Sequence, residues 1–135
     1  MEELCSGLRV QHGCGAYPVD CWKLARAMEV RVIYGVWAGR PHAVCFYPLR
    51  LILLNSKRSQ ASQRFDLAHE LAHYVLGVER YHSSTPNQFA AELLMPASVF
   101  RLEALVHGVD GNCSELFGVN ESVVKMRARE LSGQR

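Results

Sequence analysis

Two histidines four residues apart, with a glutamate directly after the first, constrain this chain more than any other feature of its sequence. They lie in the stretch RFDLAHELAHYVLG as His69, Glu70 and His73. On a helix, positions i and i+4 lie on one face about one turn apart, so both imidazoles can bind one ion. Zinc accepts two such nitrogens, and Glu70, rotated about 100° from His69, can reach a water molecule beside the ion. The spacing is typical of a zinc metallopeptidase with Glu70 as its general base.

An ordinary amphipathic helix is the alternative interpretation of the same residues, because two histidines on a helix surface need no metal. Here, however, His69, Glu70 and His73 interrupt an otherwise apolar helix, FDLAHELAHYVL. Burying these polar groups without partners would be unfavourable, and a bound metal would satisfy them. We therefore favour the metal site and expect Zn²⁺ as the cofactor.

The segments around this helix predict an α+β fold. Asp20 can cap a helix that ends near Met28, and a strand-like run begins at Val30. Two further short apolar runs follow, and together we expect a small antiparallel sheet of about three strands packed on the HExxH helix. That helix begins at Ser59 or Ser62 and ends at Gly77. The C-terminal half is predicted to be helical, with helices over 86–95 and 97–107 and a pair of short helices over 115–133.

Length and composition limit the class of protein. At 135 residues we expect one domain, residues 1–135. The apolar runs are too short for a membrane span, and a net charge of +2 makes nucleic acid an unlikely partner. The five cysteines form an odd set without a C-x-x-C pair, and the N-terminus shows no secretory signal. We expect reduced thiols and a cytoplasmic location.

The C-terminal segment, about residues 110–132, has the pattern of a helix-turn-helix, with two short predicted helices joined by a turn. Its last predicted helix carries Lys125, Arg127 and Arg129. These side chains could contact phosphates, but a solvated helix face explains them equally well, so both interpretations stay open.

Three segments, in order along the chain, carry a resemblance to a known family. They are QRFDLAHELAHYVLG, NQFAAELLMP and LFGVNESVVKMRAREL. With the preceding VDCWKLARAMEVRVIYG and LILLNS, they resemble the ImmA/IrrE family of zinc metallopeptidases over roughly residues 18–132. The resemblance implies a zincin-like peptidase domain from a bacterium, phage or mobile element, with a helix-turn-helix repressor as its protein substrate. It also implies His69 and His73 as zinc ligands and Glu70 as the general base.

The third zinc ligand does not carry over from the family. The resemblance places Ser83 where the family has its ligand glutamate, and serine is a poor ligand for zinc. His82 is the first candidate to replace it, with Glu92 and Glu79 as alternatives. His42 is a further histidine that could face the same cleft from the sheet.

Three hypotheses for the function follow. The first is a zinc endopeptidase that cleaves a repressor and relieves repression, with the substrate held as an added strand at an edge of the sheet. The second is a catalytically impaired relative that binds a repressor or antitoxin without cutting it, which the missing glutamate favours. The third is a DNA-binding regulator that works through its C-terminal helices, against which the low net charge counts.

Overall fold

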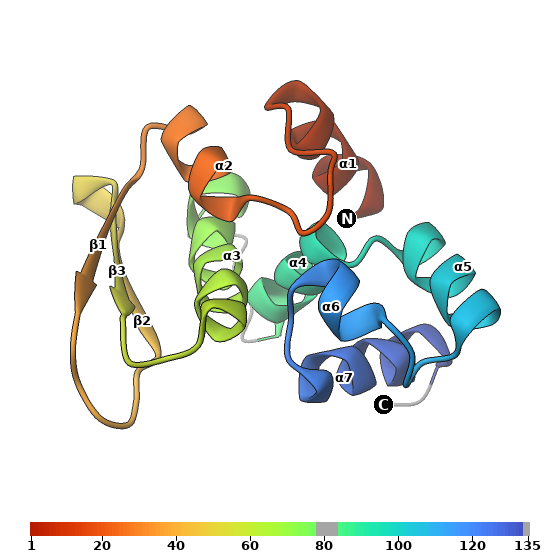
Figure 1. The fold of residues 1–135 in the computed structure, drawn as a ribbon. Helices are drawn as coiled ribbons and strands as arrows, with labels where there is room; N and C mark the ends of the chain where they lie inside the picture. The colour runs from red at the N-terminus through yellow and green to blue at the C-terminus, as the bar shows by residue number, and fades with distance from the viewer. Residues whose placement is uncertain (78–83, 134–135) are drawn as a thin grey trace.

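The computed structural model describes residues 1–77 and 84–133, and its three-stranded sheet lies at one side of a group of helices (Figure 1). The predicted α+β class and the helical C-terminal half are confirmed. Along the chain the elements are α1 (Glu2–Gln11), α2 (Cys21–Ala27), β1 (Arg31–Gly35), β2 (Ala43–Phe46), a short 3₁₀ helix (Tyr47–Leu49), β3 (Leu51–Asn55), α3 (Gln60–Leu76), α4 (Thr85–Leu94), α5 (Ala97–His107), α6 (Cys113–Phe117) and α7 (Glu121–Leu131).

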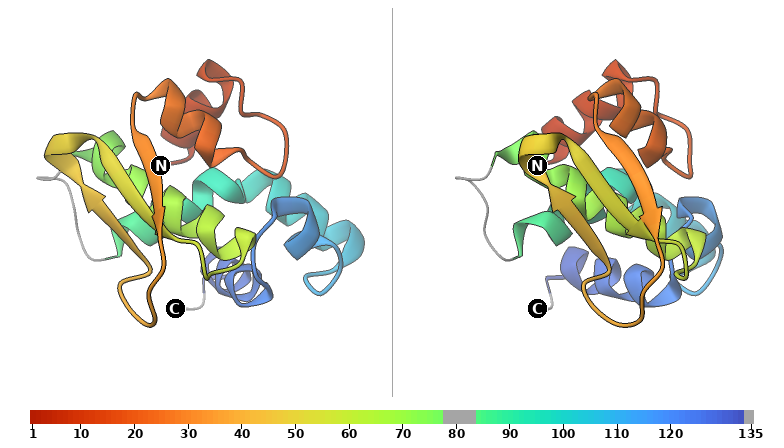
Figure 2. Two further views of the ribbon diagram at one scale, coloured as in Figure 1. Left: turned by 60° about the vertical axis from the view of Figure 1, so that its left-hand side comes forward. Right: turned by 90° about the vertical axis from the view of Figure 1, so that its left-hand side faces the viewer.

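The sheet has the strand order β1-β3-β2, with β3 in the centre. β2 pairs with β3 in antiparallel register, whereas β1 pairs with β3 in parallel register. The sheet is therefore mixed, and the expectation of an entirely antiparallel sheet is wrong for the β1–β3 pair. The reason is that β1 and β2 do not form a hairpin. The loop between them crosses from one edge of the sheet to the other, which leaves room for β3 between the two strands (Figure 2).

One face of the sheet is covered by α3. Alternate side chains of the central strand, Ile52 and Leu54, are fully buried, as expected for a strand with one face against a helix. The helix α3 contributes buried leucine and alanine side chains to the core, including Leu71 and Ala72, both fully buried. The helix α4 packs against α3 on the side away from the sheet (Figure 1). The HExxH helix is thus enclosed between the sheet and α4.

Local signals set the ends of the helices, mostly as predicted. Asp20 caps α2 by accepting a hydrogen bond from the backbone N–H of Lys23. Ser59 caps α3 through the backbone N–H of Ser62, and α3 ends at Gly77, whose φ is +75°. α4 begins at Thr85 with Ser84 as its cap, one residue before the start of the helix predicted over 86–95. The N-terminal helix α1 was not anticipated from the sequence.

The C-terminal helices α6 and α7 occur where the helix-turn-helix-like segment was predicted. Arg127, however, is 6% exposed, and its guanidinium Nη2 lies 2.5 Å from Oε1 of Glu92. Its Nε also donates to the carbonyl of Met95. Both sequence interpretations are therefore wrong for Arg127, which is neither on a solvated face nor available to a phosphate. In the described part of the chain, no helix is long and apolar enough to cross a membrane.

Candidate metal centre and its cleft

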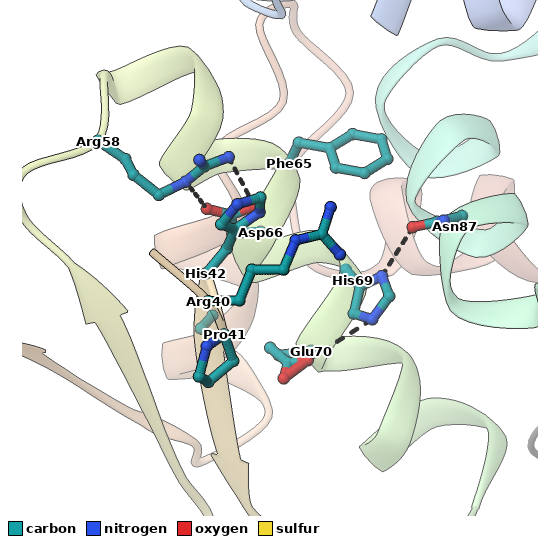
Figure 3. A pocket seen from close by; sticks show the side chains of 10 residues that line it. Arg40, Pro41, His42, Arg58, Phe65, Asp66, His69, Glu70 and Asn87 are labelled. Atoms are coloured by element: carbon teal, nitrogen blue, oxygen red, sulfur yellow. Dashed lines mark hydrogen bonds and ion pairs between the residues drawn. The ribbon is translucent and has the colours of Figure 1, made fainter. Parts of the chain in front are cut away.

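The polar side chains of the HExxH helix line a cleft between the start of β2, α3 and the start of α4. The cleft has a volume of about 790 Å³, and His69, Glu70 and Asn87 lie together at one side of it (Figure 3). Glu70 is nearly buried, with its side chain 10% exposed, whereas the side chains of His69 and His73 are 33% and 25% exposed. The helix therefore presents two accessible imidazoles beside one enclosed carboxylate.

The three groups converge on one point. Nε2 of His69 and Nε2 of His73 each lie 3.9 Å from the same carboxylate oxygen, Oε2 of Glu70. That oxygen is buried and, among the described residues, has no hydrogen-bond partner. An unsatisfied buried carboxylate oxygen is unfavourable unless a ligand, ion or water supplies the missing interaction. The site therefore provides an acceptor for a bound group that lies close to both imidazoles.

The surroundings shift the protonation of two of these groups. Burial, with a smaller effect from the nearby Asp66, raises the pKa of Glu70 to about 7. Burial, followed by the charge of His69, lowers the pKa of His73. A lowered pKa keeps the His73 imidazole neutral, and the neutral form is the one that binds metals. A cation beside Glu70 would favour its charged form.

A hydrogen bond fixes the orientation of the first imidazole. Nδ1 of His69 donates to Oδ1 of Asn87 at the start of α4, with a distance of 2.8 Å. Because Nδ1 carries the proton, Nε2 of His69 retains its lone pair and can bind a metal. An outer hydrogen bond of this kind is the usual support for a metal-binding histidine.

These observations fit a zinc site as far as the described residues extend. The two available imidazoles match the two histidine ligands of an HExxH zinc site, and the unsatisfied oxygen of Glu70 matches the acceptor that such a site needs beside the ion. In residues 1–77 and 84–133, no group of three His, Cys, Asp or Glu side chains is placed to hold a metal ion. Two of the three candidates for the third ligand, His82 and Glu79, lie outside the described residues. The other, Glu92, is 5% exposed, and its Oε1 contacts the guanidinium of Arg127.

The opposite wall of the cleft is basic. Arg58 pairs with Asp66, with Nε 2.7 Å from Oδ2, and Arg40 and His42 line the same cleft from the loop before β2 (Figure 3). His42 thus faces the cleft, as considered from the sequence. Arg40 was missed, because no local pattern indicates that this loop folds toward α3. Asp66 could have been found, since it precedes His69 by three residues and shares its helix face.

Comparison with known proteins gives a match to the IrrE N-terminal-like domain, a peptidase family, over residues 34–129. Among solved structures, a Mycobacterium tuberculosis transcriptional regulator is similar to this chain, with a TM-score of 0.69 at 14% sequence identity. The likeness covers 96% of this chain but only 47% of that one, and at this identity it concerns the fold alone. Among curated proteins, none matches this chain.

Proposed function

Because this chain belongs to the IrrE N-terminal-like peptidase family, we propose that it is a zinc-dependent endopeptidase that cleaves a specific protein. The observation that carries the proposal is the convergence of His69, His73 and Glu70, with an unsatisfied carboxylate oxygen 3.9 Å from both imidazole nitrogens. Family membership supports peptidase chemistry as a class. Zinc as the metal and a protein as the substrate are our inferences.

His69 and His73 would hold the metal through their Nε2 atoms, together with a third ligand for which His82 is our first candidate. When bound, zinc supplies Lewis-acid chemistry, which polarises a carbonyl and makes water more acidic. Oε2 of Glu70 would accept the proton of the attacking water and return it to the leaving amine. The burial of Glu70 excludes competing bulk water from that proton transfer.

The edge strand β2 offers a place for the substrate. Ala43, the first residue of this strand, lines the same cleft as His69 and Glu70. β2 pairs only with β3 in the described sheet, so its other edge is open to an added strand. An extended peptide on that edge would pass the HExxH helix with its backbone fixed by main-chain hydrogen bonds.

We propose a helix-turn-helix transcriptional repressor as the substrate, and relief of repression as the outcome. The support is the family resemblance. The similar solved structure bears the name of a transcriptional regulator, but this likeness concerns the fold alone and names no substrate.

The test is the substitution Glu70→Gln, which keeps the shape of the side chain and leaves both histidines in place. General-base catalysis typically contributes roughly 10² to 10⁴ in rate, so cleavage should nearly vanish while zinc and partner binding remain. We would co-express the chain with a repressor encoded beside its gene, and follow repressor length on gels and the output of a repressed reporter. Joint loss of cleavage and of derepression in this variant supports the peptidase.

A second candidate function is a binding module that docks a repressor or antitoxin without cutting it. The observation in its favour comes from the sequence, where the family resemblance places Ser83, a poor zinc ligand, at the position of the ligand glutamate. Full derepression by Glu70→Gln, with the repressor intact, would show that binding alone is sufficient.

Zinc titrations of His82→Ala and Glu79→Ala would test these candidates for the third ligand, since only loss of the true ligand should weaken zinc binding strongly. Glu92→Ala also removes the buried partner of Arg127, so its zinc titration is compared with that of Arg127→Met, which breaks the same pair and keeps Glu92.

A further inference from the structure

Among the described residues that line the cleft of the candidate metal centre, one arginine, Arg40, has no partner. Arg58, the other arginine of the cleft, is neutralised by Asp66 at 2.7 Å. The guanidinium of Arg40 makes no hydrogen bond or ion pair with any residue of the described ranges. Figure 3 shows its side chain extending across the cleft toward His69. An arginine in this position is free to bind a group on the substrate.

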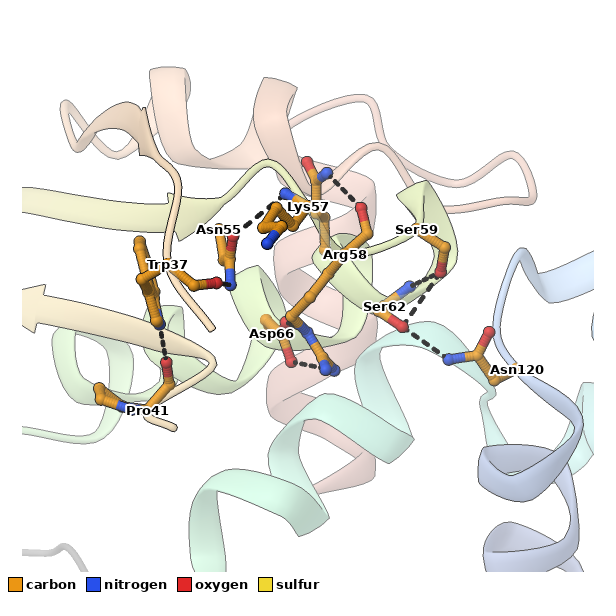
Figure 4. A network of polar contacts seen from close by, with 10 residues as sticks. Trp37, Pro41, Asn55, Lys57, Arg58, Ser59, Ser62, Asp66 and Asn120 are labelled. Carbon is orange, nitrogen blue, oxygen red and sulfur yellow. Dashed lines mark hydrogen bonds and ion pairs between the residues drawn. The ribbon is translucent and has the colours of Figure 1, made fainter. Parts of the chain in front are cut away.

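The backbone that carries Arg40 is fixed on the sheet rather than loose. Nε1 of Trp37 donates to the carbonyl of Pro41 over 2.6 Å, which closes the loop around Arg40. Nδ2 of Asn55, a side chain at the end of β3, donates to the carbonyl of Trp37 over 2.8 Å (Figure 4). Asn55 is 3% exposed, so these bonds tie the loop to the buried part of the sheet. Arg40 therefore projects from a defined position beside the metal centre.

The balance of charge in the cleft determines what Arg40 can bind. Of its two carboxylates, Asp66 is paired with Arg58, whereas Glu70 lies between the two imidazoles and keeps one oxygen unsatisfied among the described residues. Glu70 can offset one positive charge, so Arg40 together with a divalent metal ion would leave the loaded cleft net positive. A guanidinium presents paired N–H donors in a plane, which match the two oxygens of a carboxylate.

We propose that Arg40 is a specificity-determining residue, which selects peptides that place a carboxylate beside the scissile bond. The inference rests on the proposed peptidase function and names the substrate class for that site. In an endopeptidase the carboxylate comes from an aspartate or glutamate side chain, and the C-terminus of a peptide is the other source of the same group, which the test distinguishes. The chemistry recognised by Arg40 is the same for both sources.

The test measures binding, so that it does not depend on turnover. Zinc-loaded Glu70→Gln protein is immobilised and exposed to two pools of short random synthetic peptides, one with amidated and one with free C-termini. Retained peptides are sequenced by mass spectrometry. The same is done with Arg40→Ala, Arg40→Lys and Arg40→Glu, each in the Glu70→Gln background. Arg101→Ala is the matched control, because it removes an exposed arginine from α5, remote from the sheet (Figure 1).

The expected result is an enrichment of aspartate and glutamate of roughly two- to five-fold, the range of a partly exposed ion pair. Arg40→Ala should abolish the enrichment, Arg40→Glu should shift it toward lysine and arginine, and Arg40→Lys should keep part of it. Arg101→Ala should leave it unchanged. Enrichment seen only with free C-termini would assign the carboxylate to the end of the peptide. An absence of any carboxylate preference, or one that survives Arg40→Ala in a folded protein, overturns the proposal.

Cleavage assays with the wild-type chain separate this inference from the proposed function. Carboxylate-dependent binding without any cleavage would leave the role of Arg40 intact and refute the peptidase. Cleavage without a carboxylate preference would refute the role of Arg40 alone. Arg40→Ala should raise KM for acidic peptides while kcat changes little. A fall in kcat with unchanged peptide selection would instead make Arg40 a transition-state group, contrary to the proposal.

Discussion

Asn87 contacts the candidate metal centre through His69, one of the two proposed histidine ligands. Its Oδ1 accepts a hydrogen bond from the Nδ1–H of His69, with a distance of 2.8 Å, and so holds the ring with Nε2 toward Glu70. Outer partners of metal-binding histidines typically contribute 10- to 100-fold to metal affinity. We therefore expect Asn87→Ala to weaken zinc binding by roughly that factor, as measured by competition with a chromogenic chelator.

Two further variants make the test of Asn87 specific. Asn87→Asp keeps an acceptor oxygen beside the ring and should retain affinity close to that of the wild type. Gln88→Ala removes the next exposed side chain of α4, for which no bond to the site is seen, and should have no effect. Equal affinity of Asn87→Ala and Gln88→Ala would show that the hydrogen bond is irrelevant to the metal.

At the scale of secondary-structure elements, two glycines have opposite surroundings. Gly7 lies on the exposed side of α1, and a Cβ there would meet no atom within 4 Å. Gly118 ends α6 with φ +63° and ψ 40°, and a Cβ there would lie 2.8 Å from Cβ of Pro18. It would also collide with Nη1 of Arg64, which donates to the carbonyl of Gly118 at 2.6 Å.

The two substitutions should change stability in opposite directions. Gly7→Ala should raise the free energy of unfolding by about 0.5–1 kcal/mol, because alanine restricts the unfolded chain and suits a helix. Gly118→Ala should lower it by at least about 1–2 kcal/mol, because the left-handed conformation is unfavourable for a residue with a Cβ. Urea denaturation of both variants gives the comparison. Destabilisation by Gly7→Ala would contradict the open surroundings of α1.

At the scale of the whole molecule, a buried charged group joins helices that are far apart in the sequence. Arg127 of α7 contacts Oε1 of Glu92 in α4 at 2.5 Å, and both side chains are less than a tenth exposed. Nη1 of Arg9 in α1 donates to the carbonyls of Glu92 and Leu93, at 3.0 Å each. α4 is thus held from both sides by arginines from the two ends of the chain.

Loss of one partner of this ion pair should strongly destabilise the fold. Glu92→Ala removes the buried partner of Arg127 and leaves it only the more exposed Glu130, 3.5 Å from its Nη1. Loss of one partner of a buried pair typically costs about 3–5 kcal/mol in the free energy of unfolding. The double variant Glu92→Ala/Arg127→Met should recover part of that loss, since it also removes the buried charge of Arg127. Glu103→Ala, which breaks the more exposed contact with His107, should cost at most about 1 kcal/mol. A small effect of Glu92→Ala in urea denaturation would contradict this role.

The features that the sequence determined by itself depend on neighbours along the chain. The side-chain period of the HExxH helix, its cap at Ser59 and its end at Gly77 follow from residues within a few positions of each other. So does the spacing that brings the nitrogens of His69 and His73 to equal distances from Glu70. Helical geometry converts such spacing directly into position, whatever the rest of the chain does.

The tertiary structure decided the features that depend on distant segments. The sequence could not show that β1 pairs in parallel with β3, because strand order depends on how the loop between β1 and β2 crosses the sheet. The sequence pattern predicts Arg127 on the surface of its helix. The packing of α7 on α4 instead makes it one half of a buried ion pair. Arg40 lines the same cleft as His69, and Asn87 bonds to His69, only because β2, α3 and α4 converge there. Side-chain period fixes which face a residue occupies, whereas only the packing of elements fixes what that face meets.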